Sequence, residues 1–68
     1  MFVLRGNRLS ELANLIKNKR EEKDMSQEDL AKEVDVSAGA VCHWEKGLRV
    51  PGGLTMLKLV RVLELEIN

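Results

Sequence analysis

Apolar residues recur along the chain at the three- and four-residue spacing of amphipathic helices. The first such stripe predicts a helix over residues 9–22 and consists of Leu9, Leu12, Ala13 and Ile16. The next residues, 23–25, break the spacing, and Asp24 is of a type that accepts a left-handed turn conformation. We therefore expect the first helix to end at this break.

Two short helices are predicted in the middle of the chain. The first begins after Ser26, because SQED at residues 26–29 resembles a capping box with Asp in place of the usual Glu or Gln. Its acidic first turn suits the positive end of the helix dipole, and its buried stripe is Leu30, Ala31 and Val34. The apolar spacing ends near Val34, so this helix is short.

The second short helix follows a tight connection at residues 35–36. Ser37 is in place to cap its N-terminus, and Gly47 is the residue type expected just after a helix C-terminus. A sector of about 100° faces inward and holds Ala40, Val41 and Trp44. The opposite face has mostly small side chains and few charges. Its residues are Ala38, Gly39, Cys42, His43 and Lys46.

A connecting loop over residues 48–53 contains the only proline, and a fourth helix is predicted from about Leu54. Its inner side holds Met56, Leu59, Val60 and Leu63. The chain is thus expected to be all-α, with two short helices joined by a minimal turn and bracketed by two longer ones. A helix-turn-helix has this shape. A length of 68 residues predicts one domain, residues 1–68.

Composition and charge narrow the function classes only in part. The formal net charge is zero, which argues mildly against nucleic-acid binding. The charges are unevenly distributed, however, because basic residues are concentrated between positions 5 and 20 and acidic residues between positions 21 and 35. Such a dipolar surface can steer an anionic partner, although two solvated helix faces would explain it equally well. The single cysteine excludes an internal disulfide, and no apolar run approaches the roughly 20 residues that span a bilayer. We therefore expect a cytoplasmic protein.

Several motifs, in order along the chain, resemble the Cro and phage-repressor type (XRE-like) of helix-turn-helix domain. IKNKREEK at residues 16–23 and SQEDLA at residues 26–31 are similar to the first two helices of that family. VSAGAV and WEKG, within residues 36–47, are similar to its recognition helix and the glycine that ends it. The resemblance covers residues 16–65. It implies a compact, four-helix, lambda-repressor-like fold with the helix-turn-helix at about residues 26–47.

In that family the third helix lies in the DNA major groove, so the resemblance implies that the slim face of this helix reads base edges. Ser37 and His43 are the polar candidates for base contacts, and the close-contact positions are Ala38, Gly39 and Cys42. Family members often carry long amides or Arg at positions 38 and 39. We therefore expect few hydrogen bonds to bases, with DNA shape supplying part of the specificity. The alternative for His43 is an idle surface residue.

The resemblance also implies contacts with the DNA backbone. Ser26 and Gln27 start the second helix, where free N–H groups can meet a phosphate, and the family residue that matches Gln27 anchors this end on DNA. Lys46 and Arg49 lie beyond the third helix, where family members touch phosphates. Simple capping and solvated surface charge are the alternatives for these residues.

One positive charge falls on the apolar side of a helix. Arg20 follows the phase of Leu12 and Ile16, and a guanidinium in that position needs a partner. Glu45 is the expected partner, and the family has the same Arg and Glu paired between these two helices. We predict a structural ion pair that holds the recognition helix against the first helix.

The fourth helix is apolar on almost every side, which leaves more apolar side chains than one core can use. The surplus residues are Leu54, Leu57 and Leu65, and such a surplus in a small domain indicates a partner surface. We predict a homodimer that pairs through this region and the terminal segments, with residues 2–4 and 65–67 as paired strands. Two recognition helices would then lie about 34 Å apart on a palindromic operator.

These features predict a sequence-specific transcriptional repressor, bacterial or phage-encoded, that binds double-stranded operator DNA at the nucleoid. The alternative is an antitoxin-like protein, which uses this fold mainly to bind a partner protein. RNA polymerase is a further candidate partner, through Asp29 or Glu33, and the alternative for these two residues is solvated surface charge. Neither an enzyme nor a cofactor is expected, because no catalytic group of side chains, phosphate-binding glycine loop or metal cluster is visible.

Overall fold

Four helices form the regular structure of the described residues. The computed structural model describes residues 7–65, and the side chains from residue 10 onward. The helices are α1 (Asn7–Glu22), α2 (Gln27–Val34), α3 (Ala38–Glu45) and α4 (Gly53–Leu63). The predicted all-α, four-helix architecture is confirmed, although α1 begins two residues before the predicted start.

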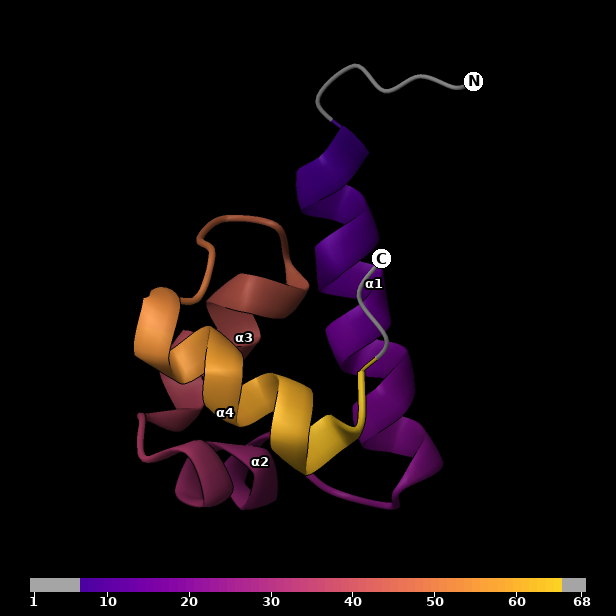
Figure 1. The fold of residues 1–68 in the computed structure, drawn as a ribbon. Coiled ribbons are helices and arrows are strands. Elements are labelled where there is room, and N and C mark those ends of the chain that lie inside the picture. The colour runs from indigo at the N-terminus through magenta and orange to yellow at the C-terminus, as the bar shows by residue number, and fades with distance from the viewer. Residues whose placement is uncertain (1–6, 66–68) are drawn as a thin grey trace.

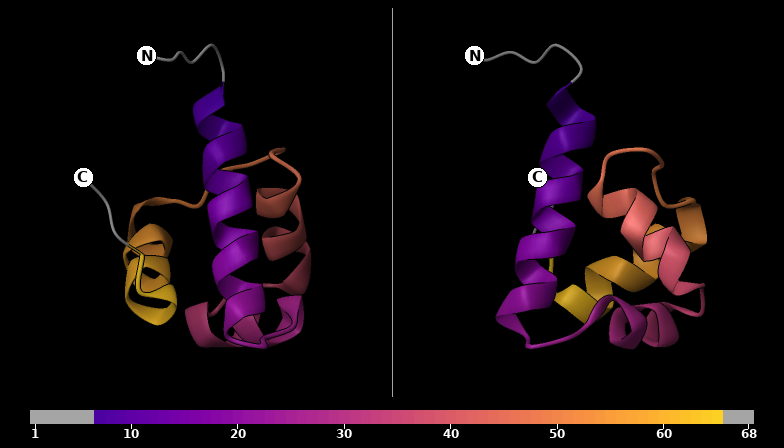
Figure 2. Two further views of the ribbon diagram at one scale, coloured as in Figure 1. Left: turned by 90° about the vertical axis from the view of Figure 1, so that its right-hand side faces the viewer. Right: turned by 180° about the vertical axis from the view of Figure 1, so that it is seen from behind.

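Helices α3 and α4 lie on opposite sides of the molecule, and α1 and α2 pack against both of them. α1 stands upright as the longest helix, and α2 lies below α3 and α4, near the C-terminal end of α1 (Figure 1). Seen from behind, α3 is the foremost of the two, and α4 lies at the back (Figure 2). One face of α3 therefore points away from the other helices.

The core lies where the inner faces of the four helices meet. The largest fully buried side chains are Ile16, Leu30, Val34, Val41, Leu59 and Leu63. Trp44 is buried as predicted, whereas Ala40 is only half-buried at the margin of the core. The apolar spacing in the sequence thus identifies the inner face of each helix. No helix within residues 7–65 has the length and apolar character needed to cross a membrane.

Each helix is followed by a residue with positive φ, which turns the chain sharply. These residues are Asp24, Asp35, Gly47 and Glu64, with φ values of 56°, 65°, 74° and 56°. The next N–H group then donates back to a carbonyl in the last turn of the helix, as in a Schellman motif. After α2, for example, the N–H of Val36 donates to the carbonyl of Ala31 over 2.9 Å. Such sharp ends allow residues 35–37 alone to join α2 to α3.

Asp35→Gly is expected to raise the free energy of unfolding by about 0.5–1 kcal/mol. Glycine adopts a positive φ without steric cost, and the change removes a negative charge from the unfavourable C-terminal end of α2. Asp35→Ala is expected to lower the free energy of unfolding, because alanine is strained at this φ of 65°. Urea unfolding measures both changes. If both variants shift the midpoint in the same direction, backbone conformation is not the controlling factor.

Leu65 belongs to the core, which corrects its prediction as a spare side chain for dimer contacts. It is 7% exposed and packs in the core cluster. On a continued helix it would lie on the same side as Leu54, but Glu64 ends α4 in a left-handed conformation and the N–H of Leu65 donates to the Val60 carbonyl over 3.0 Å. This reversal turns the side chain inward. The predicted paired strands fall outside the described residues except for Leu65, which is not in a strand.

Candidate DNA interface

Hydrogen bonds hold α3 at both ends. At the N-terminus, the Ser37 Oγ accepts the N–H of Ala40 over 3.2 Å. At the C-terminus, Gly47 takes its left-handed conformation and the N–H of Leu48 donates to the carbonyl of His43 over 2.9 Å. The helix has only 8 residues and would be unstable alone. Its caps and buried side chains therefore determine its position.

The outward face of α3 carries most of the residues predicted to read bases. Val41 and Trp44 lie on the opposite, buried side of the helix and attach it to the core. The exposed positions are Ser37, Gly39, His43 and Lys46, and the half-buried ones are Ala38 and Cys42. The five predicted base-contact residues thus lie on α3 or directly before it, and each is exposed or half-buried. In the view from behind, α3 stands in front of α4 (Figure 2).

Ala38 is turned partly toward α2. It lines a shallow hollow together with Ala31 and Val36, and the other lining residues are Glu28 and Lys32 of α2. Its methyl group is therefore less available to a base than the sequence pattern suggested.

Gly39 is a glycine that the fold does not require. It does not have the positive φ that favours glycine, and an added Cβ would meet only the Ser37 Oγ, at an ordinary contact distance of 3.8 Å. Glycine within a helix costs roughly 0.5–1 kcal/mol relative to alanine. This position on the outward face therefore suits close approach by another molecule better than it suits helix stability.

Gly39→Ala is expected to raise the free energy of unfolding by about 0.5–1 kcal/mol and to weaken duplex binding by roughly tenfold, or about 1.4 kcal/mol. The added methyl group stabilises the helix but separates it from the DNA. Thermal unfolding and fluorescence anisotropy with a labelled duplex measure the two effects. Asn14→Ala, at an exposed position of α1, is the control that should stabilise the helix and leave binding unchanged. Unchanged binding by Gly39→Ala would contradict the close approach.

The N-terminus of α2 already has hydrogen-bond partners within the chain. Ser26 and Asp29 form a full capping box, in which Ser26 Oγ accepts the N–H of Asp29 and Asp29 Oδ2 accepts the N–H of Ser26, both over 2.9 Å. The bond from the Ser26 backbone is the main cause of the lowered pKa of Asp29, so its carboxyl group stays ionised. Ser26 therefore has only its hydroxyl hydrogen to offer a phosphate, beside a negative charge.

Arg20 and Glu45 form an ion pair between α1 and α3. Arg20 Nε donates to Glu45 Oε2 over 2.6 Å, and Nη2 donates to Oε1 over 3.0 Å. Arg20 Nη1 also donates to the carbonyl of Met25 over 2.7 Å, and Gln27 Nε2 donates to Glu45 Oε1 over 3.0 Å. The side chains of Arg20 and Glu45 are 11% and 5% exposed. Sequence reasoning missed the contact of Gln27, because its partner lies on another helix.

The ion pair controls the protonation of Glu45. Burial by itself would raise the pKa of this carboxyl group, but hydrogen bonds from Arg20 and Gln27, together with the Arg20 charge, lower the pKa below its ordinary value. The hydrogen bond to Glu45 raises the pKa of Arg20, which keeps the guanidinium charged. Unfolded glutamate titrates at about pH 4.3. The stability from Glu45 is therefore complete above that pH and is lost as the pH falls through the lower, folded pKa.

We expect the free energy of unfolding of the wild type to fall more steeply than that of Glu45→Gln between about pH 5 and pH 3. The glutamine cannot take up the proton that the unfolded wild type binds more readily than the folded one. Urea unfolding at a series of pH values measures both slopes. Equal slopes for the two proteins would show that Glu45 does not titrate differently on folding.

The loop after α3 exposes both basic and apolar side chains. Lys46 and Arg49 are exposed, and within residues 10–65 neither forms an ion pair. The exposed large apolar residues of the described chain all lie in this loop and the first half of α4. They are Leu48, Val50, Leu54 and Leu57, with exposed fractions of 66%, 59%, 69% and 65%, and we refer to them as the loop–α4 patch. Sequence reasoning missed Leu48 and Val50, because a loop has no helical spacing by which to judge them.

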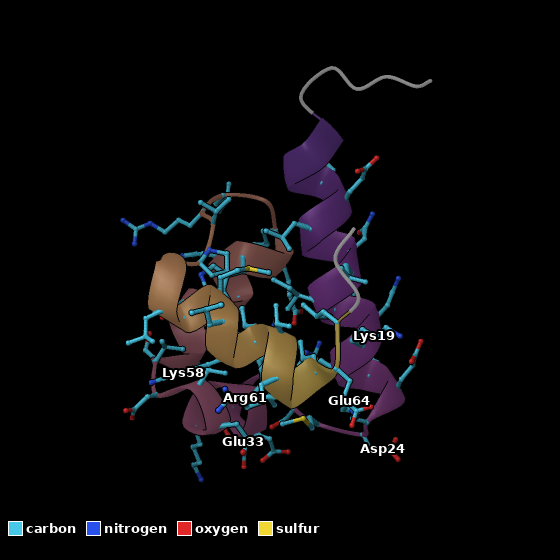
Figure 3. All side chains as sticks on the ribbon, in the orientation of Figure 1. Lys19, Asp24, Glu33, Lys58, Arg61 and Glu64 are labelled. Carbon is cyan, nitrogen blue, oxygen red and sulfur yellow. The ribbon has the colours of Figure 1, made fainter. Side chains whose placement is uncertain are left out.

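Charged side chains lie on the remaining exposed surface of α4. Figure 3 shows Lys58 and Arg61 on the edge of α4 nearer α2, and Glu64 at the end of the helix beside the last turn of α1. Lys23 Nζ lies 3.5 Å from Glu64 Oε2, but an exposed ion pair contributes only about 0–1 kcal/mol. The buried leucines of α4 therefore attach it to the core.

The fold and this surface define a helix-turn-helix DNA-binding domain. A family model described as helix-turn-helix matches residues 16–68, and the chain therefore belongs to the helix-turn-helix family of the Cro and phage-repressor type. This is a family of DNA-binding regulatory domains and not of enzymes. The match does not favour the antitoxin-like alternative. No curated protein matches the sequence significantly.

Proposed function

We propose that the protein, as a single domain over residues 1–68, is a transcriptional repressor that binds a palindromic duplex operator as a homodimer and acts by occupying it. The observation that carries this proposal is the outward face of α3, a helix that is capped at both ends and attached to the core by Val41 and Trp44. On that face Gly39 and Cys42 are small, and only His43 and Lys46 have long side chains. The major groove admits an α-helix. A slim face lets the helix backbone come close to the base edges.

His43 and Ser37 provide the polar base contacts in this proposal. Both are exposed beside the outward face of α3, and His43 lies one turn after Gly39, so the two share a side of the helix. Gly39 and Cys42 are close-contact positions, whereas Ala38 contributes less because it is turned partly toward α2. With few hydrogen-bond donors, the protein obtains part of its specificity from DNA shape.

Lys46, Arg49 and Gln27 make the main contacts with phosphates. Lys46 and Arg49 are exposed next to the end of α3, and each phosphate that a basic side chain neutralises adds about 0.9 to the magnitude of the salt slope. Ser26 contributes through its hydroxyl group only. Because Asp29 places a negative charge beside Ser26, the phosphate contact at this end of α2 is made mainly by Gln27.

The loop–α4 patch is the proposed dimer interface. Leu54 and Leu57 were expected to be spare and are exposed, Leu48 and Val50 extend the same region, and Leu65 has no part in it because it is buried. An exposed apolar patch on a small domain supports a partner surface, and a two-fold axis would cover the same patch on both copies. Such a dimer would place two α3 helices about 34 Å apart, on successive turns of DNA.

One further partner and a location belong to the same proposal. Glu33 is exposed on α2 and is the better acid for a contact with RNA polymerase, because the Asp29 carboxylate is engaged in the capping box. The protein would act on DNA at the nucleoid, in the cytoplasm of a bacterium, whether the gene is bacterial or carried by a phage.

Selection of bound sequences from random duplexes tests the proposed function. The wild type is expected to select a palindromic motif, and His43→Ala is expected to lose preference at one position in each half-site. Arg61→Ala, on the exposed surface of α4, is the control that should select the wild-type motif. A wild type that selects no motif, or a motif that His43→Ala leaves intact, would contradict the proposal or the role of His43, respectively.

A further inference from the structure

A chain of hydrogen bonds leads from the interior of the protein to the start of α2. Arg20 donates to the carbonyl of Met25 on one side and to both carboxylate oxygens of Glu45 on the other. Glu45 Oε1 also accepts a hydrogen bond from Gln27 Nε2 over 3.0 Å. Arg20 and Glu45 are nearly buried, whereas Gln27 is half-buried in the first turn of α2. This series of hydrogen bonds therefore ends at the surface where a phosphate contact is proposed.

The carboxylate of Glu45 determines the orientation of the Gln27 amide. An ionised carboxylate only accepts hydrogen bonds, so the nitrogen of the amide, and not its oxygen, faces Glu45. This nitrogen carries two hydrogens, of which Glu45 takes one, and the other can still donate. A glutamine without this restraint would lose rotamer freedom when it binds DNA, whereas Gln27 has already lost that freedom on folding. The side chain is thus preorganised as a donor.

We infer that Glu45 is a positioning residue for DNA binding, which directs the free amide N–H of Gln27 toward a backbone phosphate of the bound duplex. The inference rests on the proposed function and gives the Arg20–Glu45 pair a second role, beyond holding α3 against α1. Arg20 orients the carboxylate, and the carboxylate orients the amide. Because Gln27 is neutral, its contact changes the affinity for DNA without changing the number of counterions released.

A double-mutant cycle on duplex binding tests the inference. The four proteins are wild type, Gln27→Ala, Glu45→Gln and the double variant, and the probe is a palindromic duplex obtained by selection. Gln27→Ala is expected to weaken binding about tenfold in the wild-type background and less than about twofold in the Glu45→Gln background. The salt slope of Gln27→Ala should equal that of the wild type, unlike that of Lys46→Ala. Equal losses of affinity in the two backgrounds would overturn the inference.

If Glu45→Gln does not fold, a measurement on the wild type alone tests the same inference. NMR spectroscopy resolves the two side-chain amide protons of Gln27. One is expected to exchange slowly with solvent in the free protein, and the other to shift when the duplex is added. If the Gln27 amide protons do not respond to the duplex while backbone amides of α3 do, the inference is overturned and the proposed function is not. A wild type that binds no duplex even at low salt would instead contradict the proposed function.

Discussion

Glu45→Ala is expected to lower the free energy of unfolding by about 3–5 kcal/mol, because it leaves a nearly buried guanidinium without its partner. Arg20 is 11% exposed and makes two of its hydrogen bonds to Glu45. A chain of 68 residues rarely has more than about 3–5 kcal/mol of stability from its core. The substitution is therefore expected to unfold a large fraction of the protein in the absence of DNA.

Thermal unfolding followed by circular dichroism measures this effect, with Glu21→Ala as the matched control. Glu21 Oε2 also approaches Arg20, to 3.9 Å from Nη2, but its side chain is 56% exposed. Removal of an exposed partner is expected to change the free energy of unfolding by less than about 1 kcal/mol. If the two alanine substitutions cost the same, the buried pair is not what stabilises the contact between α1 and α3.

Leu57→Glu is expected to weaken binding to a full palindromic duplex by about 100-fold or more. Two half-sites that are bound by one dimer gain a factor of about 10²–10⁴ over one half-site, and a charge in the loop–α4 patch removes that gain. Because Leu57 is 65% exposed, the fold should be retained. Affinity for a duplex with a single half-site is expected to change little.

Anisotropy titrations with full and half-site duplexes, together with sedimentation, measure these effects. Leu57→Lys separates the loss of the dimer from simple charge repulsion, because it adds a charge that DNA attracts and still disrupts an apolar interface. Both substitutions are expected to lower affinity for the full duplex. If Leu57→Lys binds as tightly as the wild type and sediments as it does, the loop–α4 patch is not the dimer interface.

The helices and their inner faces could be predicted from the sequence because local rules control them. The spacing that buries Ile16, Leu30 and Leu59 is a property of each helix alone. Ser26 and Ser37 cap the next turn through atoms three residues away, which a short sequence window contains. The fold class and the central pair of helices follow from these signals.

The features that could not be predicted depend on where the chain turns. Leu65 continues the spacing of Leu54 on a straight helix, and only the left-handed conformation of Glu64 brings it into the core. The hydrogen bond between Gln27 and Glu45 requires the position of α2 against α3, which no window of sequence contains. Contacts between helices that are distant in sequence therefore need coordinates.

We propose that duplex DNA binds to the outward face of α3. Backbone amide chemical shifts, recorded while a selected palindromic duplex is titrated into the labelled protein, test it most directly. We predict the largest changes at Gly39, Cys42 and His43, with further changes at Gln27 and little change along the outer edge of α1. Changes confined to the loop–α4 patch, or no changes even in dilute salt, would contradict the claim.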